Sequence, residues 1–97
     1  MNQELLILQF QQQDVQAYEK LYNAYCKSIS GVINTIVKDV EVTEEITQDV
    51  FVKVYQSINT FKSNSSLKTW IYRITINQSL DFIKQKTINP MVQRYLQ

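Results

Sequence analysis

The sequence has almost none of the residues that interrupt a helix, and it has no histidine. There is one glycine and one proline in 97 residues, whereas a protein of short strands needs turn residues roughly every 8–12 positions. This composition argues against an all-β fold. The single cysteine, Cys26, cannot form an internal disulfide, so we interpret it as structural. Without histidine the sequence offers neither a Cys/His zinc site nor a Ser-His-Asp or Cys-His pair, and we predict no metal and no cofactor.

Long apolar runs are also missing. The apolar run 5–8 is too short for a signal core or a membrane span, and no basic region precedes it. We therefore expect a cytoplasmic chain with no membrane insertion. Hydrophobic residues make up 44% of the chain, which is typical of a folded domain, and this length is enough for one hydrophobic core.

A net charge of +1 conceals a strong asymmetry between the two halves. Residues 1–49 carry eight acids and three bases, whereas residues 50–97 carry one acid and seven bases. Such a division favours two surfaces with different partners, the basic one facing a polyanion. Helical proteins often segregate charge without a functional reason, so charge alone does not decide the function.

Apolar residues recur at helical spacing, so we predict an all-α, single compact bundle of about four helices. The first helix spans roughly residues 3–12. The second is capped by Asp14 and reaches about Val37, with Gly31 marking a close approach of another helix. We predict a third helix that is capped by Thr43 and ends near Ile58. We predict a fourth helix that is capped by Ser65 or Ser66 and runs from Leu67 to about Lys86, before Pro90.

The third helix divides into two sides at about 100° per residue. The predicted core side consists of Thr47, Val50, Phe51, Val54 and Ile58. The opposite side gathers Glu45, Gln48, Asp49, Val52 and Gln56. An acidic face with a valine in its middle suits docking on a basic protein surface, although an ordinary solvated face has the same composition.

The fourth helix has two apolar patches and a polar strip between them. One patch is Leu67, Trp70, Ile71, Ile74 and Phe82; the other is Tyr72, Ile76 and Ile83. We therefore expect the helix to be packed on from two directions. Arg73, Asn77 and Lys84 align within about 40°, and such residues can hold phosphates and contact a base edge.

The segment before the fourth helix offers an aromatic ring beside short polar groups. It consists of Phe61, Lys62, Ser63, Asn64, Ser65 and Ser66. A loop of this kind can hold an unstacked base. The alternative interpretation is that Phe61 and Trp70 belong to the core and that the hydroxyl groups only cap a helix.

Four segments resemble region 2 of the extracytoplasmic-function (ECF) sigma factors, over roughly residues 3–87. Asp14-Val-Gln-Ala-Tyr-Glu-Lys-Leu-Tyr is similar to D-x-x-A-F-x-x-L-Y, and Glu45-Ile-Thr-Gln-Asp-Val-Phe-Val-Lys-Val-Tyr to D-L-V-Q-E-V-F-L-x-A-W. Phe61-Lys-Ser-Asn-Ser-Ser-Leu-Lys-Thr-Trp-Ile-Tyr-Arg-Ile-Thr-Ile-Asn is similar to F-R-G-x-S-x-F-x-T-W-L-Y-R-I-A-x-N, and Asp81-Phe-Ile-Lys to D-x-x-R. Their order and spacing make the resemblance specific.

The resemblance implies a sigma factor that directs core RNA polymerase to promoters and recognises and melts the −10 element. The implied polymerase-binding residues, which would dock on the β′ clamp helices, are Glu45, Gln48, Asp49 and Val52. The implied contacts to the −10 non-template strand are Phe61, Lys62, Ser63, Asn64, Ser65, Ser66, Arg73, Asn77 and Lys84. An anti-sigma factor is a further implied partner.

The chain departs from the family pattern in its loop, where Ser63 replaces a glycine, Asn64 a frequent aspartate and Leu67 an aromatic residue. These departures leave the identity of the captured base open. Nothing resembles region 4, so we assign residues 1–87 to the helical domain and residues 88–97 to a linker or truncated end. The alternative function is a protein-interaction adaptor without DNA contact. An enzyme is the least favoured, because Glu44, Glu45 and Asp49 are predicted to lie on the surface rather than in a pocket.

Overall fold

The computed structural model describes residues 14–61 and 65–96, together with Leu5, Leu8 and Gln12, and it describes side chains as far as Gln85. Three α-helices and one short 3₁₀ helix follow each other along these residues, and no strand occurs among them. The all-α prediction is confirmed. Of the predicted first helix, Leu5 and Leu8 have helical backbone, and the rest lies outside the described residues.

Helix α2, Val15–Val37, begins where the sequence predicts. The Asp14 carboxylate accepts a hydrogen bond from the Gln16 N–H at 2.9 Å, which satisfies one of the free donors of the first turn. The helix ends at Lys38, whose φ of 56° lies in the left-handed region. The prediction of a close approach at Gly31 is wrong, because an added Cβ would meet nothing within 4 Å.

Helix α3, Val40–Ser57, begins earlier than predicted. Its cap is Asp39, whose carboxylate accepts the Val42 N–H at 3.1 Å. Thr43 is therefore not the cap but a buried residue of the first turn, with its hydroxyl donating to the Asp39 carbonyl at 2.6 Å. In the sequence, Asp39 and Thr43 are both suitable N-cap residues, and only the packing of Thr43 against α2 shows which of them is the cap.

The 3₁₀ helix η1, Ile58–Thr60, follows α3 directly, and α4 runs over Leu67–Leu96. Ser66 caps α4, since its Oγ accepts the Thr69 N–H at 3.1 Å. The prediction that the helix ends near Lys86 is wrong, because α4 continues through Pro90. A proline in the interior of a helix destabilises it by about 3 kcal/mol, and this penalty does not end α4 at Pro90.

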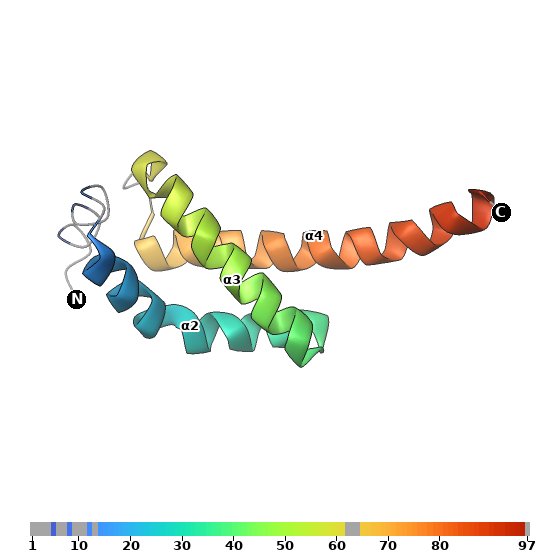
Figure 1. The fold of residues 1–97 in the computed structure, drawn as a ribbon, viewed down its shortest axis with the longest axis horizontal. Coiled ribbons are helices and arrows are strands. Elements are labelled where there is room, and N and C mark those ends of the chain that lie inside the picture. The colour runs from blue at the N-terminus through green and yellow to red at the C-terminus, as the bar shows by residue number, and fades with distance from the viewer. Residues whose placement is uncertain (1–4, 6–7, 9–11, 13, 62–64, 97) are drawn as a thin grey trace.

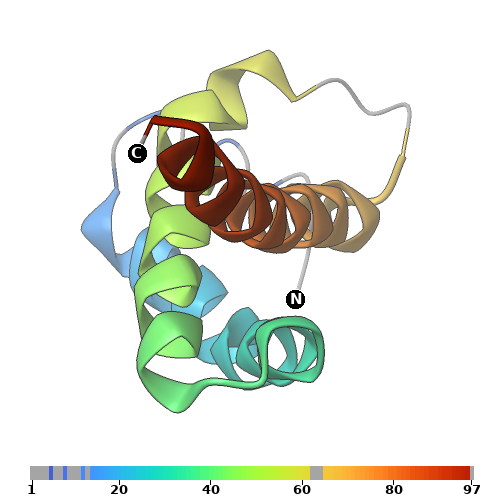
Figure 2. The same ribbon diagram turned by 90° about the vertical axis from the view of Figure 1, so that its right-hand side faces the viewer.

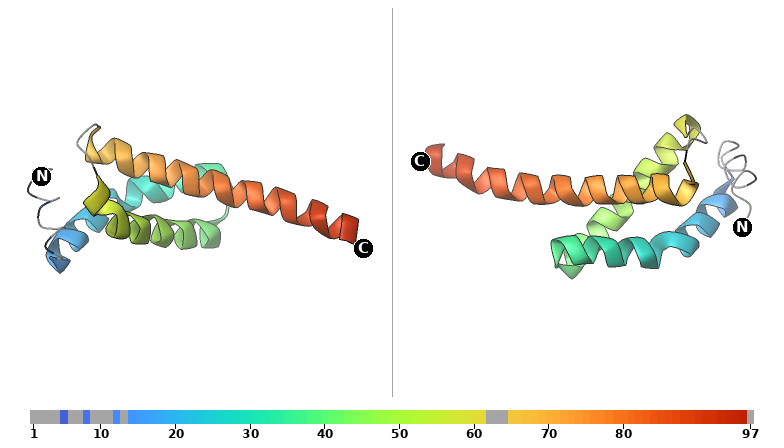
Figure 3. Two further views of the ribbon diagram at one scale, coloured as in Figure 1. Left: turned by 90° about the horizontal axis from the view of Figure 1, so that it is seen from above. Right: turned by 180° about the vertical axis from the view of Figure 1, so that it is seen from behind.

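The three α-helices pack against one another in every pairing. Helix α3 crosses α2 and α4 diagonally, and the C-terminal part of α4 projects beyond both (Figure 1). The view along α4 shows α3 beside it and α2 below it (Figure 2), and the view from behind again places α2 below α4 (Figure 3).

The core lies where the three helices meet. Its fully buried apolar side chains are Leu21, Ile29, Ile33, Val50, Phe51, Val54 and Ile71. Burying a side chain of this size stabilises the fold by about 1.5–3 kcal/mol relative to leaving it exposed. The predicted core side of α3 is confirmed, because all five of its residues are buried.

Four hydroxyl residues share this interior, and of these only Thr47 was predicted to be buried. The others are Thr43, Thr75 and Ser79. Thr75 and Ser79 donate to carbonyls of α4 four residues earlier, at 2.9 and 2.8 Å. Thr47 bonds the Ser30 hydroxyl of α2 at 3.1 Å, so the buried hydroxyl groups are satisfied.

The expectation that α4 is packed on from two directions is wrong within the described residues. Its first patch faces the core, with Leu67 and Ile71 buried. In the second patch, Ile76 and Ile83 remain 42% and 36% exposed. The buried residues Leu67, Ile71, Thr75 and Ser79 follow at intervals of four and mark one side of the helix, which leaves the opposite side to solvent.

Candidate functional site

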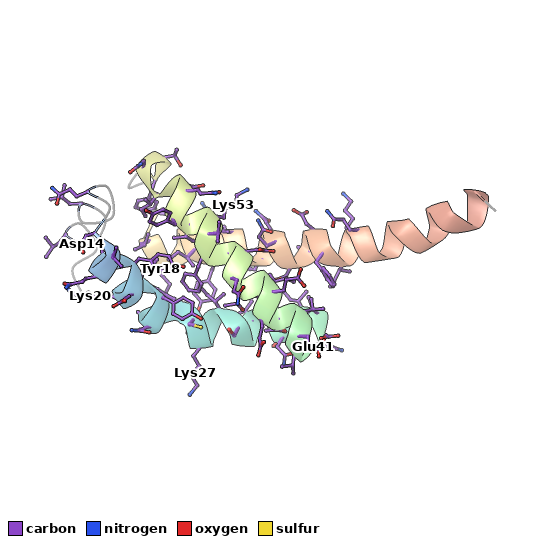
Figure 4. The ribbon with its side chains drawn as sticks, viewed as in Figure 1. Asp14, Tyr18, Lys20, Lys27, Glu41 and Lys53 are labelled. Atoms are coloured by element: carbon purple, nitrogen blue, oxygen red, sulfur yellow. The ribbon has the colours of Figure 1, made fainter. Side chains whose placement is uncertain are left out.

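The acidic face of α3, defined as Glu45, Gln48, Asp49 and Val52, lies on the outside of the molecule. All four residues are exposed, because they are on the side opposite the buried Val50 and Val54. Figure 4 shows Glu41 near the beginning of α3 and Lys53 in its second half. The division of this helix into a core side and an acidic outer side is confirmed.

A cleft of about 370 Å³ separates the acidic face from α4. Glu45 and Asp49 line one wall, and Asp81, the one acid of α4, contributes to the other. Three carboxylates therefore surround one hollow, where they make the potential negative and favour a basic partner. In the sequence, Asp81 stands out only as part of a motif, because nothing in its spacing places it opposite α3.

On its other side, the acidic face borders α2. Val52 lines an apolar groove of about 380 Å³ with Val15, Tyr18, Tyr55 and Gln56. Gln48 lines a smaller hollow of about 310 Å³, to which α2 contributes Tyr22 and Cys26. The four predicted polymerase-binding residues thus share one ridge, with hollows on both sides of it.

Cys26 is half-buried and has a free thiol. A hydrogen bond with this thiol is the main cause that raises the pKa of the Tyr22 hydroxyl above its ordinary value of 10.0, and charge repulsion and burial act in the same direction. The tyrosine therefore stays neutral across the physiological range.

Phe61 does not offer its ring to a ligand. The side chain is 9% exposed and packs against Trp70, with ring centroids 5.2 Å apart and planes inclined by 55°. The prediction that a base stacks on Phe61 is therefore corrected: the ring belongs to the core, as the alternative interpretation held. The local sequence does not distinguish a buried phenylalanine at the beginning of a loop from an exposed one.

The loop after Phe61 is described only at its end, since Lys62, Ser63 and Asn64 lie outside the described residues. Ser65 is half-buried and Ser66 is exposed. Besides capping α4, Ser66 donates from its Oγ to the Thr69 hydroxyl at 2.9 Å. The capping role that the sequence allowed for these hydroxyls is confirmed for Ser66.

The polar strip of α4, defined as Arg73, Asn77 and Lys84, is exposed along its whole length. It lies on the side of the helix away from Ile71 and Thr75, as the helical period requires. Two cationic side chains and one amide therefore face solvent together. This is an arrangement that can hold phosphates and contact a base edge.

A further hollow, of about 340 Å³, borders this strip near the beginning of α4. It is lined by Lys68, Thr69, Tyr72, Arg73 and Ile76. The Lys68 ammonium nitrogen lies 5.8 Å from the centroid of the Tyr72 ring. Tyr72 and Ile76 were predicted to lie in a second apolar patch that another element packs on, so the helical pattern does not indicate this hollow.

No cluster of three or more potential metal-binding side chains occurs in the described part of the chain. None of its helices combines the length and the hydrophobicity that a membrane crossing requires.

Comparison with known proteins gives one consistent result. Residues 21–88 match the family described as Sigma-70 region 2. The RNA polymerase sigma-H factor of Pseudomonas aeruginosa is 29% identical over 85 residues, which cover 88% of this chain and 44% of the relative. The ECF RNA polymerase sigma factor SigX of Bacillus subtilis is 33% identical over 78 residues, covering 79% and 40% respectively. The chain thus spans less than half the length of these relatives.

The fold has a counterpart among solved structures. An engineered region 2 of sigmaE, determined by NMR in complex with GTAAAA, superposes with a TM-score of 0.79 at 22% sequence identity. The superposition covers 92% of this chain and 94% of that one, so the arrangement of helices is that of the sigmaE domain.

Proposed function

Because the chain belongs to the Sigma-70 region 2 family, we propose that it is the part of an ECF sigma factor that binds core RNA polymerase and recognises the −10 element. Sigma factors act by binding, so membership of this family confirms that the chain is not an enzyme. The observation that carries the proposal is that the acidic face of α3 and the polar strip of α4, which contains two cationic side chains, lie on separate helices of one small domain.

The acidic face of α3 is the proposed polymerase surface. Its carboxylates complement a basic docking partner, and Val52 with the apolar groove beside it supplies contact area that excludes water. The partner that the family resemblance implies is the clamp-helix region of the β′ subunit. An anti-sigma factor would have to cover the same ridge or the strip on α4 to block initiation.

The strip on α4 is the proposed surface for the −10 non-template strand, together with the loop that includes Ser65 and Ser66. Arg73 and Lys84 would hold phosphates, and Asn77 would contact one base edge through its amide. The engineered sigmaE region 2 was solved in complex with GTAAAA, which supports a nucleic-acid ligand for this fold. We keep the loop residues 62–64, a helix over residues 3–12, and the division at residue 87 as predictions.

Salt dependence tests this proposal most directly. Each phosphate contact to a single strand contributes about −0.7 to the slope of log K against log salt concentration. Arg73, Lys84 and the neighbouring Lys68 should therefore give a slope near −2 with fluorescein-labelled single-stranded oligonucleotides, measured by anisotropy. An adaptor without DNA contact would show no binding at any salt concentration, and this result would refute the DNA-binding half of the proposal.

A further inference from the structure

The outer side of α4 presents a line of apolar side chains beside the polar strip. This apolar stripe consists of Tyr72, Ile76, Leu80 and Ile83, at helical intervals of four, four and three. We propose that the apolar stripe lies on an anionic lipid surface, with the lysine and arginine side chains at its edges contacting the headgroups. Lipid binding goes beyond the proposed function, because neither polymerase docking nor promoter recognition requires it.

The geometry of the apolar stripe is that of one continuous surface. At about 100° and 1.5 Å per residue, it covers about 80° of the circumference of α4 and runs for about 16 Å along the axis. Ile76 and Leu80 remain 42% and 52% exposed, whereas the buried residues of α4, such as Ile71 and Thr75, lie on the other side. Exposed apolar side chains that adjoin one another mark an interaction surface, unlike single scattered ones.

Both edges of the apolar stripe carry positive charge. Lys68 borders one edge, and Arg73 and Lys84 border the other; all three are exposed. Asp81, the one acid of α4, lies instead in the cleft toward α3. This distribution favours an anionic occupant. A second copy of the chain is disfavoured, because stripe-to-stripe packing would bring the cations of both copies together.

The pattern of the side chains favours a lipid surface over an acidic protein. A single helix with an aliphatic line between basic residues is typical of helices that lie in the plane of a membrane interface. The long stems of Lys68, Arg73 and Lys84 can lie along the apolar layer while their charged ends reach the phosphates. Tyr72 is half-buried, and the Lys68 ammonium nitrogen lies 5.8 Å from the centroid of its ring. A tyrosine suits this boundary, because its ring is apolar and its hydroxyl polar.

Lipid binding and DNA binding should exclude each other, a consequence that does rest on the proposed function. The polar strip begins within about 20° of Leu80 on the circumference of α4, and Arg73 and Lys84 belong to it. A bilayer in contact with the apolar stripe would therefore cover the residues proposed to hold the DNA strand. Vesicles should displace a labelled oligonucleotide from the wild type.

The experiment measures binding of the 97-residue chain to vesicles by co-sedimentation. One set of vesicles contains equal parts of phosphatidylglycerol and phosphatidylcholine, and the other phosphatidylcholine alone. The test variants are the double substitution Ile76→Ser/Leu80→Ser and the single substitution Lys68→Ala. Val40→Ser, which changes a valine that is 69% exposed on α3, and Lys27→Ala, an exposed lysine of α2 that points away from α4 (Figure 4), are the matched controls.

We expect the wild type to bind the anionic vesicles and not those of phosphatidylcholine alone. Ile76→Ser/Leu80→Ser should weaken this binding by about tenfold or more, because it removes apolar area that the bilayer would bury. Lys68→Ala should weaken it by about fivefold, which is about 1 kcal/mol per basic residue near an anionic surface converted at 1.36 kcal/mol per tenfold. Both controls should bind like the wild type. Fluorescence of Trp70, which packs against Phe61, verifies that each variant is folded.

Two vesicle results would overturn the inference. Wild-type binding by the double variant would mean that charge alone attracts the chain and that the apolar stripe takes no part. Equal binding to phosphatidylcholine would contradict the role of the basic edges. A dimer of the wild type that Ile76→Ser/Leu80→Ser dissociates, measured by light scattering without vesicles, would show that a second copy covers the stripe instead.

The oligonucleotide separates this inference from the proposed function. A chain that binds single-stranded DNA but no vesicle refutes lipid binding and leaves the proposed function standing. A chain that binds anionic vesicles but no DNA gives the opposite result. Ile76→Ser/Leu80→Ser should keep its affinity for the oligonucleotide, and a loss of DNA binding with intact vesicle binding would assign the apolar stripe to DNA.

Discussion

Helices α3 and α4 bury their inner sides in the same core and present opposite charge to solvent. The outer side of α3 carries Glu45 and Asp49, and that of α4 carries Arg73 and Lys84. The buried sides also differ, since α3 contributes Phe51 and two fully buried valines, whereas α4 contributes a narrower line that includes Thr75 and Ser79. A domain of this size can therefore offer two partners two surfaces of different charge, provided that one shared core holds both helices.

The largest expected effect comes from removing that shared core. Phe51→Ala should lower the free energy of unfolding by about 3–5 kcal/mol, because the ring is fully buried and contacts Tyr22 at a centroid distance of 4.8 Å. Urea denaturation followed by circular dichroism measures the loss. Val52→Ala, an exposed change on the same helix, should stay within about 0.5 kcal/mol. If Phe51→Ala impaired only one of the two binding activities, the surfaces would not depend on a common core.

Charge reversal on α3 should separate the two surfaces. Asp49→Lys should weaken binding to core polymerase by roughly tenfold or more, because it places like charges together at the proposed interface. Binding to single-stranded DNA should not weaken. Quantitative pull-down with purified core polymerase provides the measurement, and Glu19→Lys, an exposed reversal on α2, is the matched control. Equal losses for both reversals would mean that net charge rather than the acidic face governs docking.

Two substitutions within the polar strip should have different effects on DNA binding. Asn77→Ala should cost about 1–3 kcal/mol at one base position and little elsewhere. Lys84→Ala should weaken every sequence alike and reduce the salt slope by about 0.7–1. Anisotropy titrations at several salt concentrations, with the base varied at each position, distinguish these patterns. The same uniform loss from both variants would contradict the division between base contact and phosphate contact.

The smallest effect is expected at the border between α2 and α3. Cys26→Ala should leave DNA binding unchanged and lower the pKa of the Tyr22 hydroxyl toward 10.0, because it removes the main cause of the raised value. Since a raised tyrosine pKa stabilises the fold below the ordinary pKa and this contribution is lost above the folded one, the variant should be slightly less stable than the wild type below pH 10.0, and the difference should disappear in alkali. NMR titration of the Tyr22 ring tests this expectation. A marked loss of DNA binding would assign Cys26 a role beyond packing.

The periodicity of apolar residues correctly predicted features that depend on one helix alone. It placed α2 between Asp14 and Val37, and it divided α3 into core and outer sides. It failed where the answer depends on a neighbouring helix. Thr43 was assigned to a cap although it faces α2, and Tyr72 was assigned to a buried patch although it borders an open hollow.

The candidate site shows the same limit. The exposure of Arg73, Asn77 and Lys84 follows from the helical period, and the structure bears it out. The burial of Phe61 depends on contact with Trp70, nine positions further along the chain. The cleft between Asp49 and Asp81 depends on how α3 crosses α4. No local pattern encodes either relation.

The buried hydroxyl groups imply that the three helices are not equally free to slide. Ser30 with Thr47, and Asn34 with Thr43, join α2 to α3 through directional bonds of 3.1 and 3.3 Å, which fix the axial register of that pair. The buried hydroxyls Thr75 and Ser79 of α4 instead donate to carbonyls of α4 itself, while Leu67 and Ile71 add apolar contacts to the core. The α2–α3 pair should therefore keep its register, and the acidic face its shape, if a partner binds to the outer side of α4.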